Sequence, residues 1–497
     1  MKVQDIDWLA VAPPLVLAGA AIVVLLLDAF FGPARTRNQA HLPAVLTVAA
    51  LIGSAVTAGA MWDDAARSTF CIERPLEGPL GCSFVVDRFT LVFWAITLFG
   101  TAVVALLGTV AIADGRTPQG EWNFLLLSSA TGALVIAASR DLVTLIVALE
   151  VVSLPAFAMA GLRHGDRRAA EASLKFFLVS VISTAVMLMG LSLVYGATGT
   201  VFFDQLNATL AVVDDTRTVA VAGALLTVVG LAFKVAAVPF HMWVPDTYVG
   251  APVAVAAYLS VVSKAAGFVG LMLVLTYALP TFADEWSPVI AVLAALTMTV
   301  GNVLALRQTH AVRLLAWSSV AQAGYILVPF GAVSGSSVGR EVLGASIGYL
   351  GIYAVINLGA FAVAALVGTR HHAQQLEDYR GLVRGEPGAG WALAFALVAL
   401  AGLPPGVVGL VAKVVVLDVA AGPATWLAVV MAVNVAIGLV YYARWLMVLF
   451  TPADDGQASR YDVPNAVAVA IGVTLTAGLT FSIFPGWIVD NAITVLG

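Results

Sequence analysis

Long apolar runs recur along almost the whole of this sequence, and short segments that hold most of the charges separate them. Of its 497 residues, 61% are hydrophobic and only 11% are charged, and the mean hydropathy is +0.98. A helix of about 20 apolar residues spans a bilayer, whereas soluble domains carry about 25% charged residues. The sequence therefore predicts an all-α polytopic membrane protein, with one transmembrane domain over residues 1–497. Its net charge of −5 gives no reason to expect nucleic acid as a partner.

We predict about 14 spanning helices, with boundaries that are soft by several residues. Their ranges are 9–31, 42–62, 88–112, 122–138, 141–161, 169–196, 218–242, 251–278, 287–306, 311–332, 341–368, 390–419, 424–450 and 464–488. The first run is too long for the core of a cleavable signal peptide and lacks a basic start. We therefore interpret it as the first spanning helix.

The distribution of arginine predicts that both termini lie outside. Cytoplasmic loops collect Lys and Arg, and an outside N-terminus leaves the larger share of the arginines, among them Arg163 and Arg168, in inner segments. Residues 63–87 then form an outward loop that holds the only cysteines, Cys71 and Cys82. An oxidising exterior favours a disulfide between them, and two unpaired thiols are the alternative.

Four of the five lysines lie inside predicted helices, namely Lys175, Lys234, Lys264 and Lys413. A charge at mid-membrane costs roughly 2.5–3.5 kcal/mol on insertion scales, so it is seldom there without a use. Lysine, unlike arginine, readily loses its proton when it is desolvated. Glu150 is the one acidic residue deep inside a predicted span and is an expected partner. This set favours a proton path, although Lys175 is close enough to a helix end to reach the interface instead.

Two of the predicted helices are interrupted. Pro239 breaks the segment 218–242, and the letters AGLPPGVVGL break the segment 390–419. His241 and Asp246 follow the first break, as path residues or as helix caps. Interrupted helices in corresponding halves indicate an inverted-repeat transporter whose site lies near the midplane.

Polar side chains are spaced along the tenth and eleventh predicted helices. They either hold water between the lysines or form hydrogen bonds between helices. They are Ser318, Ser319, Gln322, Tyr325, Tyr353 and Asn357.

The motifs around these residues resemble the antiporter-like membrane subunits of respiratory complex I, and the subunit N family most closely. They are EASLKFFL at 171–178, FHMWVPDTYVGAP at 240–252, SKAAGF at 263–268, AWSSVAQAGY at 316–325, NLGAF at 357–361, AGLPP at 401–405 and YYAR at 441–444. The sister subunits L and M share this layout. The SKAAGF run fits N better, and Lys413 argues against M, where glutamate is expected.

This resemblance implies 14 helices that include two inverted five-helix half-channels. The first covers residues 121–278 (helices 4–8) and the second covers 287–451 (helices 9–13), with breaks in helices 7 and 12. The sequence departs from the family at Gln322, where histidine is frequent, so a titrating group in helix 10 is in doubt. It departs again at Val253 and Ala254, which replace a more usual Thr-Pro pair.

The resemblance also implies a role for each charged residue. Glu150 and Lys234 match an ion pair, Lys264 matches the central lysine that links the halves, and Lys413 matches the exit residue. Lys175 matches a further lysine of the family whose role is less settled.

The implied function is that of a proton-translocating, non-redox subunit of NADH:quinone oxidoreductase in a bacterial inner membrane. The expected partners are neighbouring antiporter-like subunits, lipid, protons and water. Flavin, iron–sulfur clusters and quinone are expected in partner subunits, and no cofactor is expected in this chain. The alternatives are a subunit of a multi-subunit cation/proton antiporter and a scaffold subunit of a hydrogenase-like membrane complex.

Overall fold

The computed structural model describes residues 5–31, 42–74, 78–212, 215–335, 337–452 and 461–487, and helices dominate it. Within these residues, thirteen helical segments are long and apolar enough to cross a membrane. The remaining expected segment, 390–419, is divided into two shorter helices by its break. The prediction of an all-α polytopic membrane protein is therefore confirmed.

The helix boundaries agree with the sequence prediction to within a few residues at most ends. The first half contains α1 (Trp8–Phe31), α2 (Leu42–Gly59), α3 (Arg88–Ala113), α4 (Gln119–Ala138), α5 (Leu142–Ala160), α6 (Arg167–Thr198), α7 (Phe203–Leu210), α8 (Arg217–Lys234), α9 (Trp243–Gly250), α10 (Val253–Tyr258) and α11 (Lys264–Leu273). The second half contains α12 (Ala283–Ala305), α13 (Ala311–Leu327), α14 (Arg340–Gly368), α15 (Leu382–Gly385), α16 (Pro387–Ala401), α17 (Val407–Ala421), α18 (Thr425–Phe450) and α19 (Asn465–Ile483). Residue 488, the predicted end of the last helix, lies outside the described residues.

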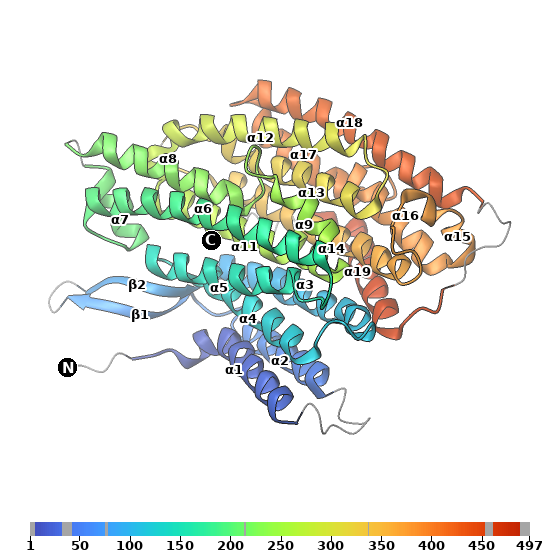
Figure 1. The fold of residues 1–497 in the computed structure, drawn as a ribbon. Helices are drawn as coiled ribbons and strands as arrows, with labels where there is room; N and C mark the ends of the chain where they lie inside the picture. The colour runs from blue at the N-terminus through green and yellow to red at the C-terminus, as the bar shows by residue number, and fades with distance from the viewer. Residues whose placement is uncertain are drawn as a thin grey trace.

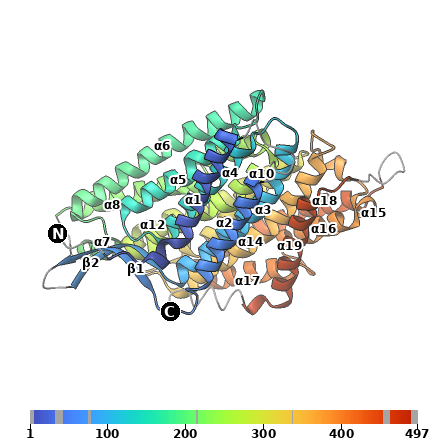
Figure 2. The same cartoon turned by 90° about the horizontal axis from the view of Figure 1, so that it is seen from below.

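The centre of the bundle is formed by α10, α11, α13 and α14, and nearly all of their residues are buried. Helices such as α6 and α19 lie at its outside and expose apolar side chains, among them Ile182 and Ile483 (Figures 1 and 2). This outer surface is suited to lipid and to neighbouring apolar helices. Charged groups on the central helices are therefore shielded by protein.

The first break begins earlier than the sequence predicts. Helix α8 ends at Lys234, and residues 235–242 form turns before α9 begins. Ala236 has a φ of 63°, which turns the chain out of the helix, and Pro239 disfavours the α conformation for the residue before it. Pro245 lies in the first turn of α9, where proline is tolerated. The helix predicted to continue to residue 242 thus ends next to its lysine.

The following span contains two π-helical turns. One, Leu259–Ser263, separates α10 from α11 and ends directly before Lys264, and the other is Val274–Ala278. Single π turns inside α-helices are rare and frequently accompany functional sites. The second break lies between α16 and α17, where Gly402 has a φ of 84°. Glycine is suited to this left-handed position because it lacks a Cβ atom.

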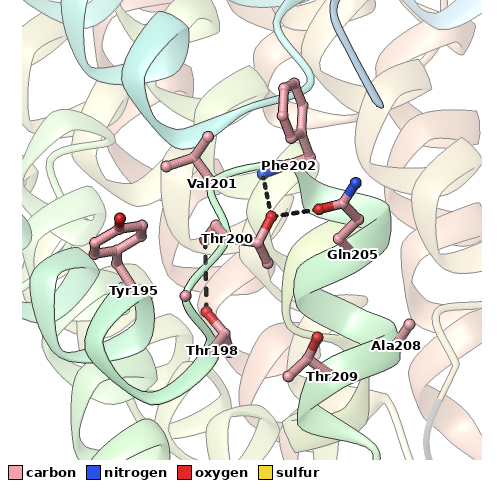
Figure 3. A pocket seen from close by; sticks show the side chains of 9 residues that line it. Tyr195, Thr198, Thr200, Val201, Phe202, Gln205, Ala208 and Thr209 are labelled. Carbon is pink, nitrogen blue, oxygen red and sulfur yellow. Dashed lines mark hydrogen bonds between the residues drawn. The ribbon is translucent and has the colours of Figure 1, made fainter. Parts of the chain in front are cut away.

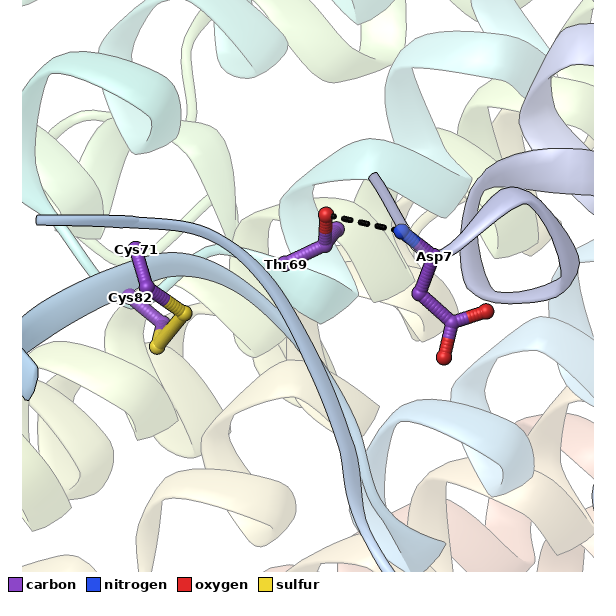
Figure 4. The surroundings of a disulfide bond; sticks show 4 residues. All are labelled: Asp7, Thr69, Cys71 and Cys82. Carbon is purple, nitrogen blue, oxygen red and sulfur yellow. Dashed lines mark hydrogen bonds between the residues drawn. A yellow bond between two sulfur atoms is a disulfide. The ribbon is translucent and has the colours of Figure 1, made fainter. Parts of the chain in front are cut away.

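The predicted outward loop is a β-hairpin, an element that the sequence analysis did not predict. Strands β1 (Arg67–Arg74) and β2 (Gly78–Val86) pair antiparallel, and residues 75–77 lie outside the described part. Cys71 and Cys82 form the disulfide that the sequence favoured (Figure 4). The hairpin and α7 lie at the same end of the bundle (Figure 1).

The hairpin is also tied to the start of α1. The backbone N–H of Asp7 donates to Thr69 Oγ1 at 3.2 Å (Figure 4), and Arg67 lies 2.8 Å from the Asp7 carboxylate. Burial acts to raise the pKa of Asp7, but hydrogen bonds from Arg67 and from the amide of Ala10 outweigh it and lower the pKa. The contact therefore stabilises the fold at neutral pH, and its contribution is lost as the pH falls through the lowered pKa.

Candidate functional site

Lys234 and Glu150 form an ion pair between α8 and α5. Lys234 Nζ lies 3.4 Å from Glu150 Oε1 and donates hydrogen bonds to Ser153 at 2.8 Å and Ser180 at 3.2 Å. Thr184 donates a hydrogen bond of 2.8 Å to the same carboxylate oxygen. The lysine side chain is 8% exposed and the glutamate side chain 29%. The pair is therefore polar and mostly enclosed, with its carboxylate toward the outside of the bundle.

Lys264 lies in the buried centre and is held by neutral groups. Its Nζ donates to the backbone carbonyl and to the hydroxyl of Ser319, both at 2.5 Å. It also lies 5.9 Å from the centre of the Tyr353 ring. No carboxylate comes within ion-pair distance of this ammonium in the part of the chain that the structure describes. A full charge here is supported only by dipoles and by an aromatic ring.

Helix α8 packs against α11 at Gly267, one helical turn after Lys264. A Cβ atom on Gly267 would lie 2.8 Å from the carbonyl oxygen of Lys234. Backbone atoms cannot rotate away as side chains can, so only glycine allows this approach. The contact fixes the end of α8, and with it Lys234, against the helix that carries Lys264.

We expect Gly267→Ala to destabilise the protein by about 1–3 kcal/mol because it forces α8 away from α11. Alanine is otherwise the better helix former by about 1 kcal/mol. Gly270→Ala is the matched control, since a Cβ there meets side-chain tips and no backbone, with Ile136 at 3.3 Å, Leu231 at 3.5 Å and Leu149 at 3.8 Å. The check is thermal unfolding of the two purified variants. Equal stability of both would show that the close approach does not matter.

Lys413 on α17 reaches the end of α16 across the second break. Its Nζ donates to the carbonyl oxygens of Leu400 at 2.7 Å and Ala401 at 2.6 Å. These carbonyls lie in the last turn of α16, where the helix dipole favours a cation. A Cβ on Gly402 would come within 3.0 Å of the ammonium, and the ammonium lies 5.9 Å from the centre of the Tyr325 ring. The break between α16 and α17 therefore leaves free the carbonyl oxygens that bind this lysine.

A chain of hydroxyl and amide groups begins beside Lys264. Ser318, the neighbour of Ser319 on α13, is 2.5 Å from the hydroxyl of Tyr442. Gln322 donates to Tyr442 at 3.2 Å and accepts from Tyr349 at 2.6 Å. All of these side chains are buried. Gln322 therefore holds two tyrosine hydroxyls in place but cannot itself titrate.

A second set of hydrogen bonds, centred on Asn302 on α12, lies toward Lys413. The amide nitrogen of Asn302 donates to Tyr325 at 2.9 Å and to Asn434 at 3.2 Å, and its oxygen accepts from Tyr441 at 3.0 Å. Tyr325 is the residue whose ring faces Lys413. Polar side chains thus lie along the interval between the central lysine and the lysine at the second break.

Comparisons with known proteins show the family of this chain. Residues 139–438 fit the family described as NADH:quinone oxidoreductase/Mrp antiporter, TM. A relative from Streptomyces griseus, NADH-quinone oxidoreductase subunit N 2, is 50% identical and is aligned over 97% of this chain and 92% of its own length.

This chain belongs to the subunit N family of NADH-quinone oxidoreductases.

One further relative and two solved structures are similar to this chain. F(420)H(2) dehydrogenase subunit N of Methanosarcina mazei is 33% identical over 98% of both chains. A chain of Thermus thermophilus respiratory complex I is 28% identical, with a TM-score of 0.76 over 96% of this chain and 98% of that one. A chain of the Mrp complex of Dietzia is 20% identical with a TM-score of 0.82, over 98% and 97%, and shares the fold alone.

Lys175 does not share the burial of the other three lysines. The sequence left open whether it lies inside the membrane or reaches the interface, and its contacts are those of a surface residue. Its side chain is 48% exposed and lies 2.8 Å from Glu171 and 3.2 Å from Asp246. Arg313 joins this cluster, 3.4 Å from Asp246. Lys175 lies in the third turn of α6, near enough to the surface for its flexible stem to reach other charges.

His241 and Asp246 do not cap α9, because no side-chain hydrogen bond caps the N-terminus of that helix. Asp246 lies in its first turn and belongs to the charged cluster around Lys175. His241 is buried, and its ring lies 5.4 Å from that of Trp317. Neither residue contacts the buried lysines through a recorded hydrogen bond or ion pair.

Sequence reasoning did not single out Tyr349, Tyr442 or Asn302 as site residues. Each is a polar residue inside an otherwise apolar span, which is a usable signal. The signal does not say which helix such a residue faces, so the network could only be assembled once α12, α13, α14 and α18 were placed together.

A cavity of about 630 Å³ lies elsewhere, between the end of α6 and α7 (Figure 3). Thr200 donates to Gln205 at 2.6 Å within it, and the N–H of Phe202 donates to Thr200 at 3.4 Å. Its lining contains hydroxyl, amide and apolar groups but no lysine or carboxylate. It therefore does not take part in the charged site.

Proposed function

We propose that this chain translocates protons in the membrane arm of an NADH-quinone oxidoreductase, along Glu150, Lys234, Lys264 and Lys413. The observation that carries the proposal is the set of three buried lysines and the hydrogen-bonding side chains between the last two. Hydroxyl groups both donate and accept, so together with ordered water they can pass a proton onward.

The first step is control of Lys234 by Glu150. A carboxylate about 4 Å away stabilises a protonated amine by about 4 kcal/mol at an effective dielectric constant of 20. A closed pair therefore keeps the proton on Lys234, and an opened pair allows transfer toward Lys264. Glu150 is the more exposed partner, so a neighbouring subunit can act on it.

The second step carries the proton from Lys264 to Lys413. A lysine with no carboxylate partner gives up a proton more easily than one that is paired. Tyr353, Tyr442 and Asn302 hold the hydrogen-bonding groups along this interval. Lys413 then releases the proton at the second break, toward the exit. Lys175 takes part in proton transfer at the surface, within the charged cluster that it forms with Glu171 and Asp246.

Electron transfer is assigned to partner subunits. Both cysteines of the chain are joined in the hairpin disulfide, so no thiolate remains to bind an iron–sulfur cluster. Flavin, iron–sulfur clusters and quinone would supply electron transfer in those subunits. We assign the protein to a bacterial inner membrane with both termini outside, an orientation that the arginine distribution supports.

The test is proton translocation by the assembled complex in proteoliposomes that oxidise NADH. We expect Glu150→Gln and Lys234→Ala to lower translocation by at least about tenfold, because each removes one member of the controlling pair. Glu285→Gln is the matched control, since Glu285 forms an ion pair with Arg217 at 2.6 Å away from the path.

Unchanged translocation in both path variants would contradict the proposal and favour a scaffold role. Translocation that requires sodium and moves it would instead favour a cation/proton antiporter.

A further inference from the structure

Two apolar grooves run along α3 on the surface of the bundle, where α2, α3, α14 and α19 lie side by side (Figure 2). The long groove lies between α2 and α3 and has a volume of about 600 Å³. The short groove lies between α3, α14 and the end of α19 and has a volume of about 290 Å³. Trp62, Ala95 and Phe99 line both grooves, so the two grooves join at these residues.

Both grooves face the hydrocarbon core of the bilayer. None of the described residues that line them is charged. Ile52 and Val469, on the long groove, are 59% and 51% exposed. From Leu91 to Leu106 this groove follows α3 for about 22 Å at 1.5 Å per residue, within a hydrocarbon core of roughly 30 Å. The grooves are therefore suited to an apolar ligand that comes from the membrane.

The volumes of the grooves distinguish an acyl chain from a protein helix. A helix about 10 Å wide that crosses roughly 30 Å of hydrocarbon fills about 2,400 Å³. The long groove holds about a quarter of that volume and the short groove holds less, so a helix would lie over the grooves instead of filling them. An unbranched acyl chain is much narrower than a helix. Two such chains joined at one end match two grooves that join at Trp62, Ala95 and Phe99.

The ends of the grooves next to the β-hairpin have the composition of a membrane–water interface. Trp62 lies shortly after α2 and Trp487 lies shortly after α19, and both line the short groove. Tryptophan is enriched at the level of the lipid headgroups. The polar end of a bound lipid is therefore expected at the hairpin end.

Two charged residues lie at this same end. Arg88 begins α3 one turn before Leu91 and Val92, which line the long and the short groove, so it lies on the face of α3 that the grooves follow. Arg88 is exposed and forms no ion pair with another described residue, so its guanidinium is available to a phosphate. Asp63, next to Trp62, is also exposed and suits an ammonium group beside that phosphate.

We propose that the two grooves bind one phosphatidylethanolamine molecule from the leaflet on the hairpin side, with one acyl chain in each groove and the phosphate at Arg88. Ile347 and Gly351 of α14 line the short groove, and α14 also carries Tyr349 and Tyr353 of the polar network. The bound lipid thus supports this helix against α3 from the bilayer side. The inference does not depend on the proposed proton translocation.

The first test is photolabelling of the assembled complex in proteoliposomes, with phosphatidylethanolamine that carries a diazirine in one acyl chain. Mass spectrometry of peptides from this chain is expected to find the label on the groove residues of α3 and α14. Unlabelled phosphatidylethanolamine should displace it at a concentration at least about tenfold lower than lysophosphatidylethanolamine, because a second buried chain adds to the affinity. Equal displacement by both lipids, or label found only elsewhere on the chain, would overturn the proposal.

The second test fills the grooves where they join. Ala95 is exposed, so Ala95→Trp places a large side chain in both grooves without disturbing the packing of α3. We expect labelling of the groove residues to fall at least about tenfold, and about fivefold in Arg88→Gln, which removes one cation at the headgroup. Ala49→Trp is the matched control, since Ala49 is exposed on α2 but lines neither groove.

Undiminished labelling of Ala95→Trp would overturn the proposal. Loss of a partner subunit from the Ala95→Trp complex, with normal assembly of Ala49→Trp, would overturn it as well, because it would show that a helix of that subunit covers the grooves.

Discussion

Lys264→Ala is expected to abolish proton translocation by the assembled complex. Lys264 hydrogen-bonds to Ser319, which also accepts a hydrogen bond from Tyr353, and the adjacent Ser318 contacts Tyr442. Loss of a group that accepts and releases a proton typically costs on the order of 10²–10⁴-fold in rate. The rate should therefore fall below the proton leak of the proteoliposomes. The measurement is internal acidification during NADH oxidation.

Lys264→Arg separates charge from proton exchange. Arginine stays protonated in proteins, so it can preserve the positive charge but cannot release a proton. We expect this variant to assemble and to translocate as poorly as Lys264→Ala. Normal translocation by the arginine variant would show that a fixed charge at this position is sufficient, and the proton path would have to bypass it.

Lys413→Ala is expected to have the second largest effect, because Lys413 serves both the fold and the path. Its removal leaves the carbonyls of Leu400 and Ala401 without the ammonium that they bind. Each buried group left unpaired costs about 1–3 kcal/mol, so we expect a lower unfolding temperature. We also expect proton translocation to be lost, because the exit residue is missing.

Lys413→Arg distinguishes these two losses, since arginine offers donors to the same carbonyls but does not release a proton. We expect it to recover much of the stability and none of the translocation. Thermal unfolding of the purified complex and acidification of proteoliposomes measure the two effects. Recovery of both by arginine would assign Lys413 a structural role only.

The three buried lysines share a physical feature that the structure makes visible. Each is close to a place where regular helix geometry is interrupted. Lys234 ends α8, Lys264 follows a π turn, and Lys413 reaches across the second break to the end of α16. Such irregular backbone is tolerated at membrane depth only where protein or water satisfies it. The interruptions therefore supply the oxygen atoms and the space that buried amines need.

The amino-acid sequence by itself determined the spanning segments and the charged residues within them, and it favoured a disulfide between Cys71 and Cys82. The reason is that bilayer thickness and the cost of buried charge act on local composition, which can be counted along the chain. Proline and glycine likewise indicated both breaks, although not that α8 ends at Lys234 itself.

Only the tertiary structure decided whether Lys175 is exposed, whether the outward loop forms a β-hairpin, and which partner each polar group has. Lys175 lies inside an apolar run, yet its long stem reaches Glu171 and Asp246 at the surface. Tyr349, Tyr442 and Asn302 lie on three different helices, and each reaches its partner on α13 only after those helices pack. A helix that is apolar on all sides has no periodicity to show which way it faces. The rotation of the central helices, and therefore the polar network, is set by packing alone.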